Sequence, residues 1–206
     1  KCGEVVGCPH CAVSLKPHSR AGKVTHLTCH YCGYTIPMPQ TCPSCGSKYI
    51  GTFGLGTEQV EQMAASRFPG ARVLRMDADT TGGKEGHDRI LKQFAAGEAD
   101  ILVGTQMIVK GHDFAKVTLV GILAADLSLN VGDYRAAERT YQLLAQAAGR
   151  AGRGDLAGEV VLQTYQPEHY SITCAADQNY VQFYKQEILM RQMLQYPPVS
   201  HILGVL

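Results

Sequence analysis

Residues 101–105, Ile101-Leu102-Val103-Gly104-Thr105, decide the fold class of this 206-residue chain. Three apolar residues followed by Gly-Thr predict a short buried strand that ends in a sharp turn. Outward from it, helical and extended patterns alternate, with helices predicted at 58–68, 85–96 and 136–148 and strands at 73–76, 117–125 and 160–164. Such alternation is typical of a parallel sheet wrapped by helices, so the sequence predicts an α/β fold.

Three polar residues stand at the ends of predicted strands of this sheet. They are Thr105, Asp126 and Thr164. Ligands of open α/β sheets bind beyond the carboxyl ends of the strands. We therefore expect the functional edge of the sheet to lie where these residues are.

Residues 146–153, Gln-Ala-Ala-Gly-Arg-Ala-Gly-Arg, place two arginines three positions apart among small residues. An ATP-cleaving site needs such cations, because charge develops on the γ-phosphate in the transition state and a guanidinium matches its oxygens. Arg150 and Arg153 are thus candidate catalytic residues. With this spacing they are expected to share one helical face, while Gly149 and Gly152 leave room for a nucleotide or a neighbouring domain. The alternative is a solvated basic turn.

Seven of the eight cysteines lie within the first 45 residues, and they include three C-x2-C pairs. Two intervening residues let a tight turn direct both sulfurs and main-chain N–H groups at one ion, and a following glycine permits the unusual backbone. Seventeen residues separate the first two pairs, which suits one tetrahedral zinc site. Its expected ligands are Cys8, Cys11, Cys29 and Cys32.

A second zinc site is expected from the remaining cysteines of this region. Cys42 and Cys45 form the third pair, and Cys2-Gly3 reads as the second half of a fourth. Its first cysteine would lie just upstream of Lys1, so two zinc ions are expected in a longer protein.

Other interpretations of this region stay open at this point. The cysteines could form a disulfide framework or hold an iron–sulfur cluster, although C-x2-C repeats in a cytosolic chain favour zinc. Four histidines could each replace a cysteine ligand: His10, His18, His26 and His30. Basic residues between the first two pairs either contact DNA phosphates or form a solvated loop: Lys16, His18, Arg20, Lys23 and His26. Cys174, far downstream, is predicted to be an inert packed thiol.

Composition sets only broad limits on function. The apolar fraction of 45% is ordinary for a globular chain, and the net charge of +1 argues neither for nor against nucleic-acid binding. The sequence has no apolar run near twenty residues and no signal peptide. We therefore expect a cytoplasmic protein without a membrane partner.

The ordered motifs resemble those of a known helicase family. Motifs V and VI of superfamily 2 helicases resemble three segments of this chain taken in order. They are residues 104–114, Gly-Thr-Gln-Met-Ile-Val-Lys-Gly-His-Asp-Phe, residues 146–153, and residues 158–164, Gly-Glu-Val-Val-Leu-Gln-Thr. Together with the segments 54–61, 75–81 and 133–139 and the cysteine-rich start, they resemble the PriA family of replication-restart helicases. The resemblance covers nearly the whole chain. It implies a RecA-like parallel sheet wrapped by helices, the second helicase lobe, with a small cysteine-rich double-zinc module.

The resemblance also implies a function and roles for residues. The family members are ATP-dependent 3′-to-5′ DNA helicases that restart stalled replication forks and initiate primosome assembly. Their cofactors are zinc, ATP and Mg²⁺, and their partners are forked or single-stranded DNA, primosome proteins and single-stranded DNA-binding protein. By resemblance, Thr105, Lys110 and Gly111 contact DNA. Nucleotide contacts are expected from Asp113, Gln146 and Gly149.

The phosphate-binding lobe of that family, with its Gly-x-x-x-x-Gly-Lys-Ser/Thr loop, is absent from this sequence. The chain is therefore expected to be a fragment that cannot hydrolyse ATP alone. The expected domains are a zinc-binding module at 1–51, the second helicase lobe at 52–195 and the start of a C-terminal domain at 196–206. Two alternatives remain: another superfamily 2 DNA translocase with a zinc insert, and a non-catalytic zinc-ribbon module that binds nucleic acid.

Overall fold

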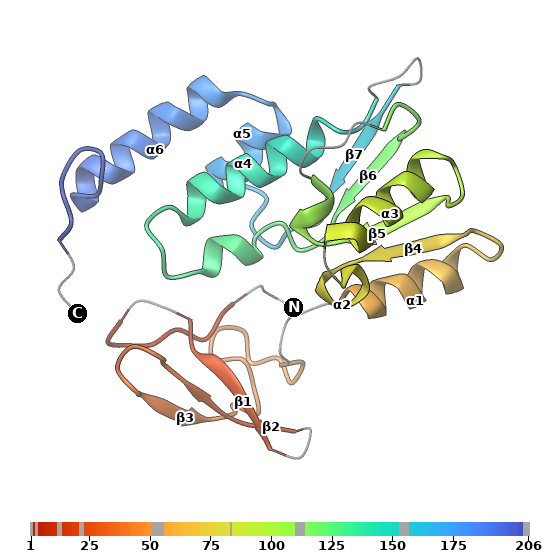
Figure 1. Ribbon diagram of the computed structural model, residues 1–206. Coiled ribbons are helices and arrows are strands. Elements are labelled where there is room, and N and C mark those ends of the chain that lie inside the picture. The colour runs from red at the N-terminus through yellow and green to blue at the C-terminus, as the bar shows by residue number, and fades with distance from the viewer. Residues whose placement is uncertain are drawn as a thin grey trace. The chain divides into compact units, whose positions relative to one another are not determined.

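The computed structural model describes residues 2, 4–11, 14–20, 23–50, 56–82, 84–109, 114–152 and 157–203 (Figure 1). The chain divides into two compact units. Unit 1 comprises residues 1–52, 121–148 and 160–206, and unit 2 comprises residues 53–120 and 149–159. No described helix combines the length and the apolar character that a bilayer span requires.

The cysteine-rich part of unit 1 contains a small antiparallel sheet. Its strands are β1 (Lys16–Arg20), β2 (Lys23–Thr28) and β3 (Thr35–Pro37), in the order β1-β2-β3. The buried core beneath the sheet consists of Leu15 and Leu27 together with two of the cysteines. A core with this few apolar side chains rarely holds a fold unaided. The module therefore needs the additional cross-links that a bound metal ion supplies.

Unit 2 carries the first half of the α/β pattern. Its elements are α1 (Thr57–Arg67), β4 (Val73–Met76), α2 (Ala78–Thr81), α3 (Lys84–Ala95), β5 (Ile101–Gly104) and the 3-10 helix η1 (Gln106–Val109). Strands β4 and β5 pair in parallel, with Met76 opposite Gly104, and both α1 and α3 contact β4 (Figure 1). The core is formed by Met76, Ile90 and Leu91, which are almost fully buried.

Asp77 fixes the turn that follows β4. Its carboxylate accepts hydrogen bonds from the main-chain N–H groups of Asp79 and Thr80, and Thr80 Oγ1 accepts one from the Asp77 N–H. This reciprocal capping starts α2. The hydroxyl of Thr57, at the start of α1, also donates to Asp77, and this bond is the largest cause that lowers the pKa of Asp77 to about 2. Asp77 thus joins two helix starts to the end of β4.

Strands β6 (Leu119–Ile122) and β7 (Glu159–Leu162) form a second two-stranded sheet. The Glu159 N–H donates to Thr118 O at 2.8 Å, and the Gln163 N–H donates to Ile122 O at 2.9 Å. Residue numbers rise together along both strands, so the pairing is parallel. All four predicted strands are therefore present, in two parallel pairs, as the α/β prediction requires.

Helices make up the rest of unit 1. They are the 3-10 helix η2 (Leu127–Asn130), α4 (Ala136–Ala148), α5 (Tyr170–Ala176) and α6 (Tyr180–Leu194). Their shared core includes Tyr141, Leu144 and Phe183, and the rings of Tyr141 and Phe183 stack at 4.2 Å. Cys174 is 2% exposed within this core, as expected of a packed thiol.

Helix α6 presents a largely charged stripe to the rest of unit 1. Its buried positions are Phe183, Glu187 and Arg191, so its inward stripe is largely an ion pair rather than an apolar face. Most of its apolar side chains are exposed: Tyr180, Val181, Tyr184, Leu189, Met190, Met193 and Leu194. Both Phe183 and the Glu187–Arg191 ion pair hold the helix, and a hydrophobic pattern alone cannot reveal the ion pair.

Candidate functional site

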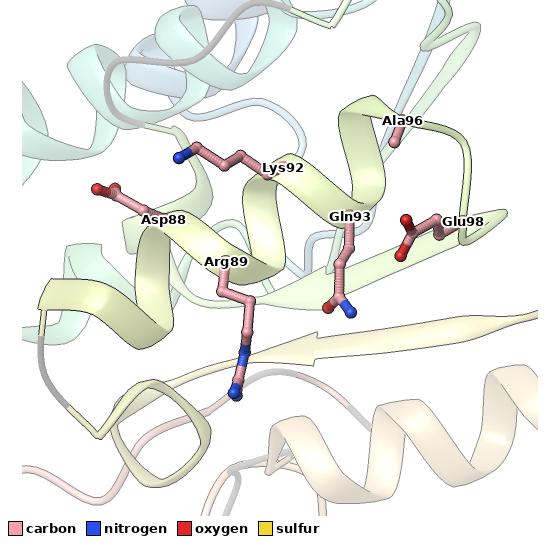
Figure 2. Close-up of a pocket in the computed structure, with 6 residues that line it drawn as sticks. All are labelled: Asp88, Arg89, Lys92, Gln93, Ala96 and Glu98. Atoms are coloured by element: carbon pink, nitrogen blue, oxygen red, sulfur yellow. The ribbon is translucent and has the colours of Figure 1, made fainter.

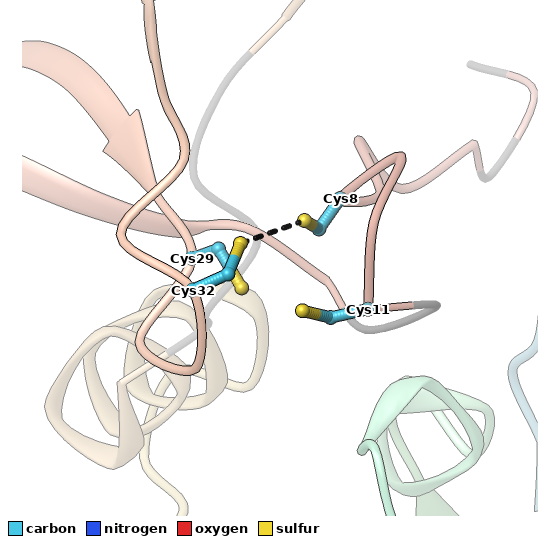
Figure 3. Close-up of side chains that lie close together, drawn as sticks. All are labelled: Cys8, Cys11, Cys29 and Cys32. Atoms are coloured by element: carbon cyan, nitrogen blue, oxygen red, sulfur yellow. Dashed lines mark hydrogen bonds between the residues drawn. The ribbon is translucent and has the colours of Figure 1, made fainter.

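Four cysteine sulfurs converge at one point of the cysteine-rich module. Figure 3 shows two turns that face each other and carry Cys8 and Cys11, and Cys29 and Cys32. The four Sγ atoms all lie within 4.8 Å of one another, and Cys8 Sγ and Cys32 Sγ are 3.6 Å apart. A tetrahedral zinc ion about 2.3 Å from each sulfur sets sulfurs about 3.8 Å apart, whereas a disulfide needs about 2.0 Å. The four residues therefore fit zinc, and this is the ligand set that the sequence predicted.

The backbone around Cys29 has the geometry expected of a metal-binding turn. The Gly33 N–H donates to Cys29 O at 2.9 Å, and Gly33 has φ of 75°, a conformation that glycine adopts without strain. Main-chain N–H groups of Cys32 and Tyr31 point at Cys29 Sγ and lower the pKa of that thiol to about 7, although burial opposes them. The turn thus prepares the thiolate form that binds zinc.

The remaining thiols of the cluster show why a cation is needed there. The pKa of Cys11 is raised to about 12, chiefly by its hydrogen bond with Cys32. Four sulfurs this close cannot all ionise unless positive charge lies between them. A bound Zn²⁺ supplies that charge and keeps all four as thiolates.

Cys42 and Cys45 repeat the same turn. The Gly46 N–H donates to Cys42 O at 2.9 Å, Gly46 has φ of 66°, and the N–H groups of Cys45 and Ser44 lower the pKa of Cys42. Cys2 joins them, with its Sγ 3.6 Å from Cys42 Sγ. The structure thus brings together the three cysteines predicted for the second site, with their sulfurs within 4.8 Å of one another.

We expect this chain to hold one zinc ion firmly and a second one weakly. The first site has four thiolates, whereas the second has three in this chain and needs a fourth donor from solvent. Elemental analysis after mild chelation should therefore give nearer one zinc than two per chain. Two firmly held ions would contradict the proposed division of the cysteines, and Cys45→Ser, which touches only the second site, serves as the matched control.

The helix that leads into the arginine segment has the predicted bounds. Helix α4 ends at Ala148, and residues 149–152 form turns. Gly152 has φ of 70°, in the left-handed region, so helical geometry does not extend through it. Arg153 lies outside the described residues, so the expectation that it shares a helical face with Arg150 stays a prediction. Arg150 itself is partly buried, next to Gly149.

The space at Gly152 is filled by this chain rather than left for a ligand. A Cβ on Gly152 would lie 2.6 Å from Gly158 N, and a Cβ on Gly158 would lie 2.1 Å from Gly152 N. The Gly152 N–H donates to Val117 O at 3.0 Å, just before β6. Two facing glycines thus anchor the arginine segment to the sheet. Gly158 belongs to the helicase-like segment 158–164, but only the structure reveals its contact with Gly152.

Other predicted site residues lie at element ends. Thr105 is exposed directly after β5, and Gln146 is exposed in the last turn of α4. Gly104 must be glycine, because a Cβ there would lie 2.6 Å from Met76 O. Asp126 is buried, and its Oδ1 accepts from the Tyr165 N–H at 3.1 Å, so it ties the segments after β6 and β7 together.

Four predicted site residues lie outside the described residues. They are Lys110, Gly111, Asp113 and Arg153. The roles expected of them stay predictions, as do those of Thr105, Gln146, Gly149 and Arg150.

A shallow surface depression lies along α3. Figure 2 shows that its side chains extend from α3 and the following turn: Asp88, Arg89, Lys92, Gln93, Ala96 and Glu98. They are mostly exposed and of mixed charge. Such a surface resembles a solvated helix face rather than a ligand site, which is typically apolar with a few convergent polar groups.

Two known protein families match this chain, one in its cysteine-rich part and one in its α/β part. The model of the helicase conserved C-terminal domain matches residues 50–155, and the model of the PriA DNA helicase Cys-rich region (CRR) domain matches residues 8–37. These matches do not favour a different translocase or a non-catalytic zinc ribbon.

Curated relatives share this arrangement. The chain is 50% identical over 201 residues to the replication restart protein PriA of Bacillus subtilis, covering 98% of the chain and 25% of that relative. It is 48% identical over 203 residues to the replication restart protein PriA of Synechocystis sp., covering 98% of this chain and 24% of that relative. To the replication restart protein PriA of Haemophilus influenzae it is 42% identical over 200 residues, covering 97% of this chain and 27% of that relative. The chain spans about a quarter of these relatives' length. On these matches, the chain belongs to the helicase conserved C-terminal domain family and, within it, to the PriA helicases.

Proposed function

We propose that this chain supplies the zinc module and the second motor lobe of an ATP-dependent 3′-to-5′ DNA helicase. The whole protein would restart stalled replication forks and initiate primosome assembly in the cytoplasm. One observation carries this proposal: a zinc-type cysteine cluster within the PriA Cys-rich match is followed on the same chain by the helicase C-terminal match. The relatives with this arrangement are named as replication restart proteins.

The proposed role of zinc is structural. Cys8, Cys11, Cys29 and Cys32 would fill all four coordination positions, which leaves no position for a reacting water. Zinc held in this way would replace the apolar core that the module lacks and keep the antiparallel sheet in place.

The proposed nucleotide site lies at the end of α4. Arg150 and Arg153 would stabilise charge on the γ-phosphate, while Gln146, Gly149 and Asp113 would contact the nucleotide. Bound Mg²⁺ would neutralise the phosphates. Two observations support the placement: Gln146 lies in the last turn of α4, and the Gly152 N–H anchors the turn after the helix to Val117 O. An arginine held on a fixed backbone needs little ordering when ATP binds.

The proposed DNA contacts lie after β5. Thr105, Lys110 and Gly111 would bind the backbone of one strand through hydroxyl, ammonium and N–H groups. The exposure of Thr105 directly after β5 supports this role. The proposed partners are forked or single-stranded DNA, primosome proteins and single-stranded DNA-binding protein.

We also propose the boundaries 1–51, 52–195 and 196–206 for the zinc module, the helicase lobe and the start of a C-terminal domain. In this scheme, the phosphate cradle and the magnesium carboxylate belong to the other motor lobe, because this sequence lacks the phosphate-binding motif.

The test compares the complete helicase with this chain alone. We expect the complete protein to unwind forked DNA only with ATP and Mg²⁺, moving 3′ to 5′ on the bound strand. The isolated chain should retain zinc but hydrolyse no ATP above background, because half a site lacks the phosphate cradle. Strand displacement on forks with a single 3′ or 5′ arm measures the first result, and phosphate release measures the second. Hydrolysis by the isolated chain would contradict the proposed division of the site.

A further inference from the structure

Two imidazole nitrogens converge on the cysteine-rich module outside the thiolate cluster. His18 lies on β1, and His30 lies in the turn between Cys29 and Cys32. Their Nε2 atoms are 3.1 Å apart, with ring centroids 5.3 Å apart and ring planes tilted by 45°. The four-cysteine site needs neither of them, because thiols fill its tetrahedron. The two histidines are therefore available as a separate ligand pair.

The separation of these nitrogens suits a shared metal ion. An octahedral or tetrahedral ion about 2.0–2.1 Å from two imidazole nitrogens sets those nitrogens about 2.9–3.4 Å apart. In the ion-free pair, one Nε2–H donates to the other Nε2. Moving that proton to Nδ1 of the same ring frees both Nε2 lone pairs to bind an ion, with no change in net charge.

We propose that His18 and His30 form an additional metal site that binds a divalent transition-metal ion, such as Ni²⁺ or Zn²⁺, through two imidazoles and water. Neutral imidazole is a preferred ligand of these ions. The site differs from the cysteine sites in its donor atoms and in its open coordination positions. Its ion would join β1 directly to the metal-binding turn of Cys29.

Both ligands are held in place by their surroundings. His18 stands opposite His26 in the β1–β2 register, and the two rings stack at 5.1 Å. His30 lies in a turn closed by the hydrogen bond from the Cys29 N–H to Tyr34 O at 2.8 Å. An ion would therefore meet ligands that lose little freedom on binding.

His26 supports the site without serving as a ligand. Its ring lies parallel to that of His18, with an interplanar angle of 5°, and its Nδ1 is 2.9 Å from Thr25 Oγ1. Within the described ranges, the groups of three or more converging metal-ligand atoms contain cysteines alone. The pair thus gives two protein ligands, and water completes the shell, so binding is weaker and faster to exchange than at the thiolates.

The test titrates Ni²⁺ into this chain, loaded with zinc beforehand, by isothermal calorimetry with zinc content measured before and after. We expect one added Ni²⁺ per chain with zinc retained. His18→Gln and His30→Gln should each weaken Ni²⁺ binding at least tenfold, and the double variant should be no weaker than either single one, because one imidazole alone holds the ion poorly. His10→Gln is the matched control, since His10 is exposed in another cysteine turn and rests against Tyr34.

Several results would overturn the proposal. Equal Ni²⁺ affinity in the original chain and in His18→Gln would do so, as would zinc release in proportion to the Ni²⁺ bound. Near-ultraviolet bands from thiolate-to-nickel charge transfer would place the ion on cysteines instead. If His30→Gln itself loses zinc, His18→Gln decides the question, because His18 lies on the sheet and outside both turns of the cluster.

Discussion

Arg153→Ala in the complete helicase is expected to lower DNA-stimulated ATP hydrolysis by about a thousandfold or more, the order seen when an arginine finger is lost. The guanidinium is proposed to meet charge that develops only in the transition state, so turnover should fall far more than ATP affinity. Phosphate release over a range of ATP concentrations, with DNA saturating, separates the two effects. DNA binding by fluorescence anisotropy and zinc content should stay unchanged.

Two further variants sharpen this experiment. Arg150→Ala should also lower turnover and, because Arg150 lies nearer the end of α4, weaken ATP binding as well. Arg89→Ala removes an exposed arginine from α3, in the depression of Figure 2, and should leave hydrolysis unchanged. Near-normal turnover in Arg153→Ala would contradict the catalytic role and favour the alternative that residues 149–153 form a basic turn without a part in catalysis.

The regular elements could be predicted from sequence because their signals are local. The strand predicted at 73–76 and the helix predicted at 136–148 coincide with β4 and α4. The strand predicted at 117–125 was too long, because Ala124 adopts φ of 52°, in the left-handed region, where a strand cannot continue. The short helix α2 was missed, although the spacing of Asp77 and Thr80 carries its capping signal.

The candidate site could be predicted only in part, for a physical reason. C-x2-C spacing determines how a turn aims its sulfurs, so Cys29 and Cys32 could be paired from sequence alone. The arginine segment instead depends on a contact between Gly152 and Gly158, which is tertiary and leaves no periodic pattern. The convergence of His18 and His30 is also tertiary, because a sheet register and a turn must both be known first.

Arg191→Ala is expected to destabilise unit 1 by about 3 kcal/mol or more, the usual cost of removing one partner from a buried ion pair. The Arg191 side chain is 10% exposed and that of Glu187 is 9% exposed. Arg191 Nε donates to Glu187 Oε1 at 2.8 Å, and Nη2 donates to Glu138 Oε2 at 2.7 Å. Alanine would leave Glu187 charged and buried without its arginine partner, while the hydroxyl of Tyr170 still donates to Oε2.

Arg191 also links α6 to two other segments of unit 1. Its Nη1 donates to Pro197 O at 2.9 Å, and its guanidinium carbon lies 5.5 Å from the centre of the Tyr134 ring. Arg191→Lys keeps the charge but has one nitrogen for these separate contacts, so it should recover only part of the loss. Burial and the Glu187 hydrogen bond both raise the pKa of Tyr170, so its phenol stays a donor at neutral pH.

Urea unfolding of the zinc-loaded chain measures these changes, with Arg139→Ala as the matched control. Arg139 also pairs with a carboxylate, Asp133, at 2.6 Å, but its side chain is 51% exposed. Such a surface pair contributes about 1 kcal/mol or less, so this variant should unfold almost as the original chain does. The double variant Arg191→Met/Glu187→Met should be more stable than Arg191→Ala, because it leaves no charge at either position. Equal destabilisation by Arg139→Ala and Arg191→Ala would show that burial does not set the strength of the Arg191 pair. The charged stripe of α6 would then have no special part in holding that helix against α4.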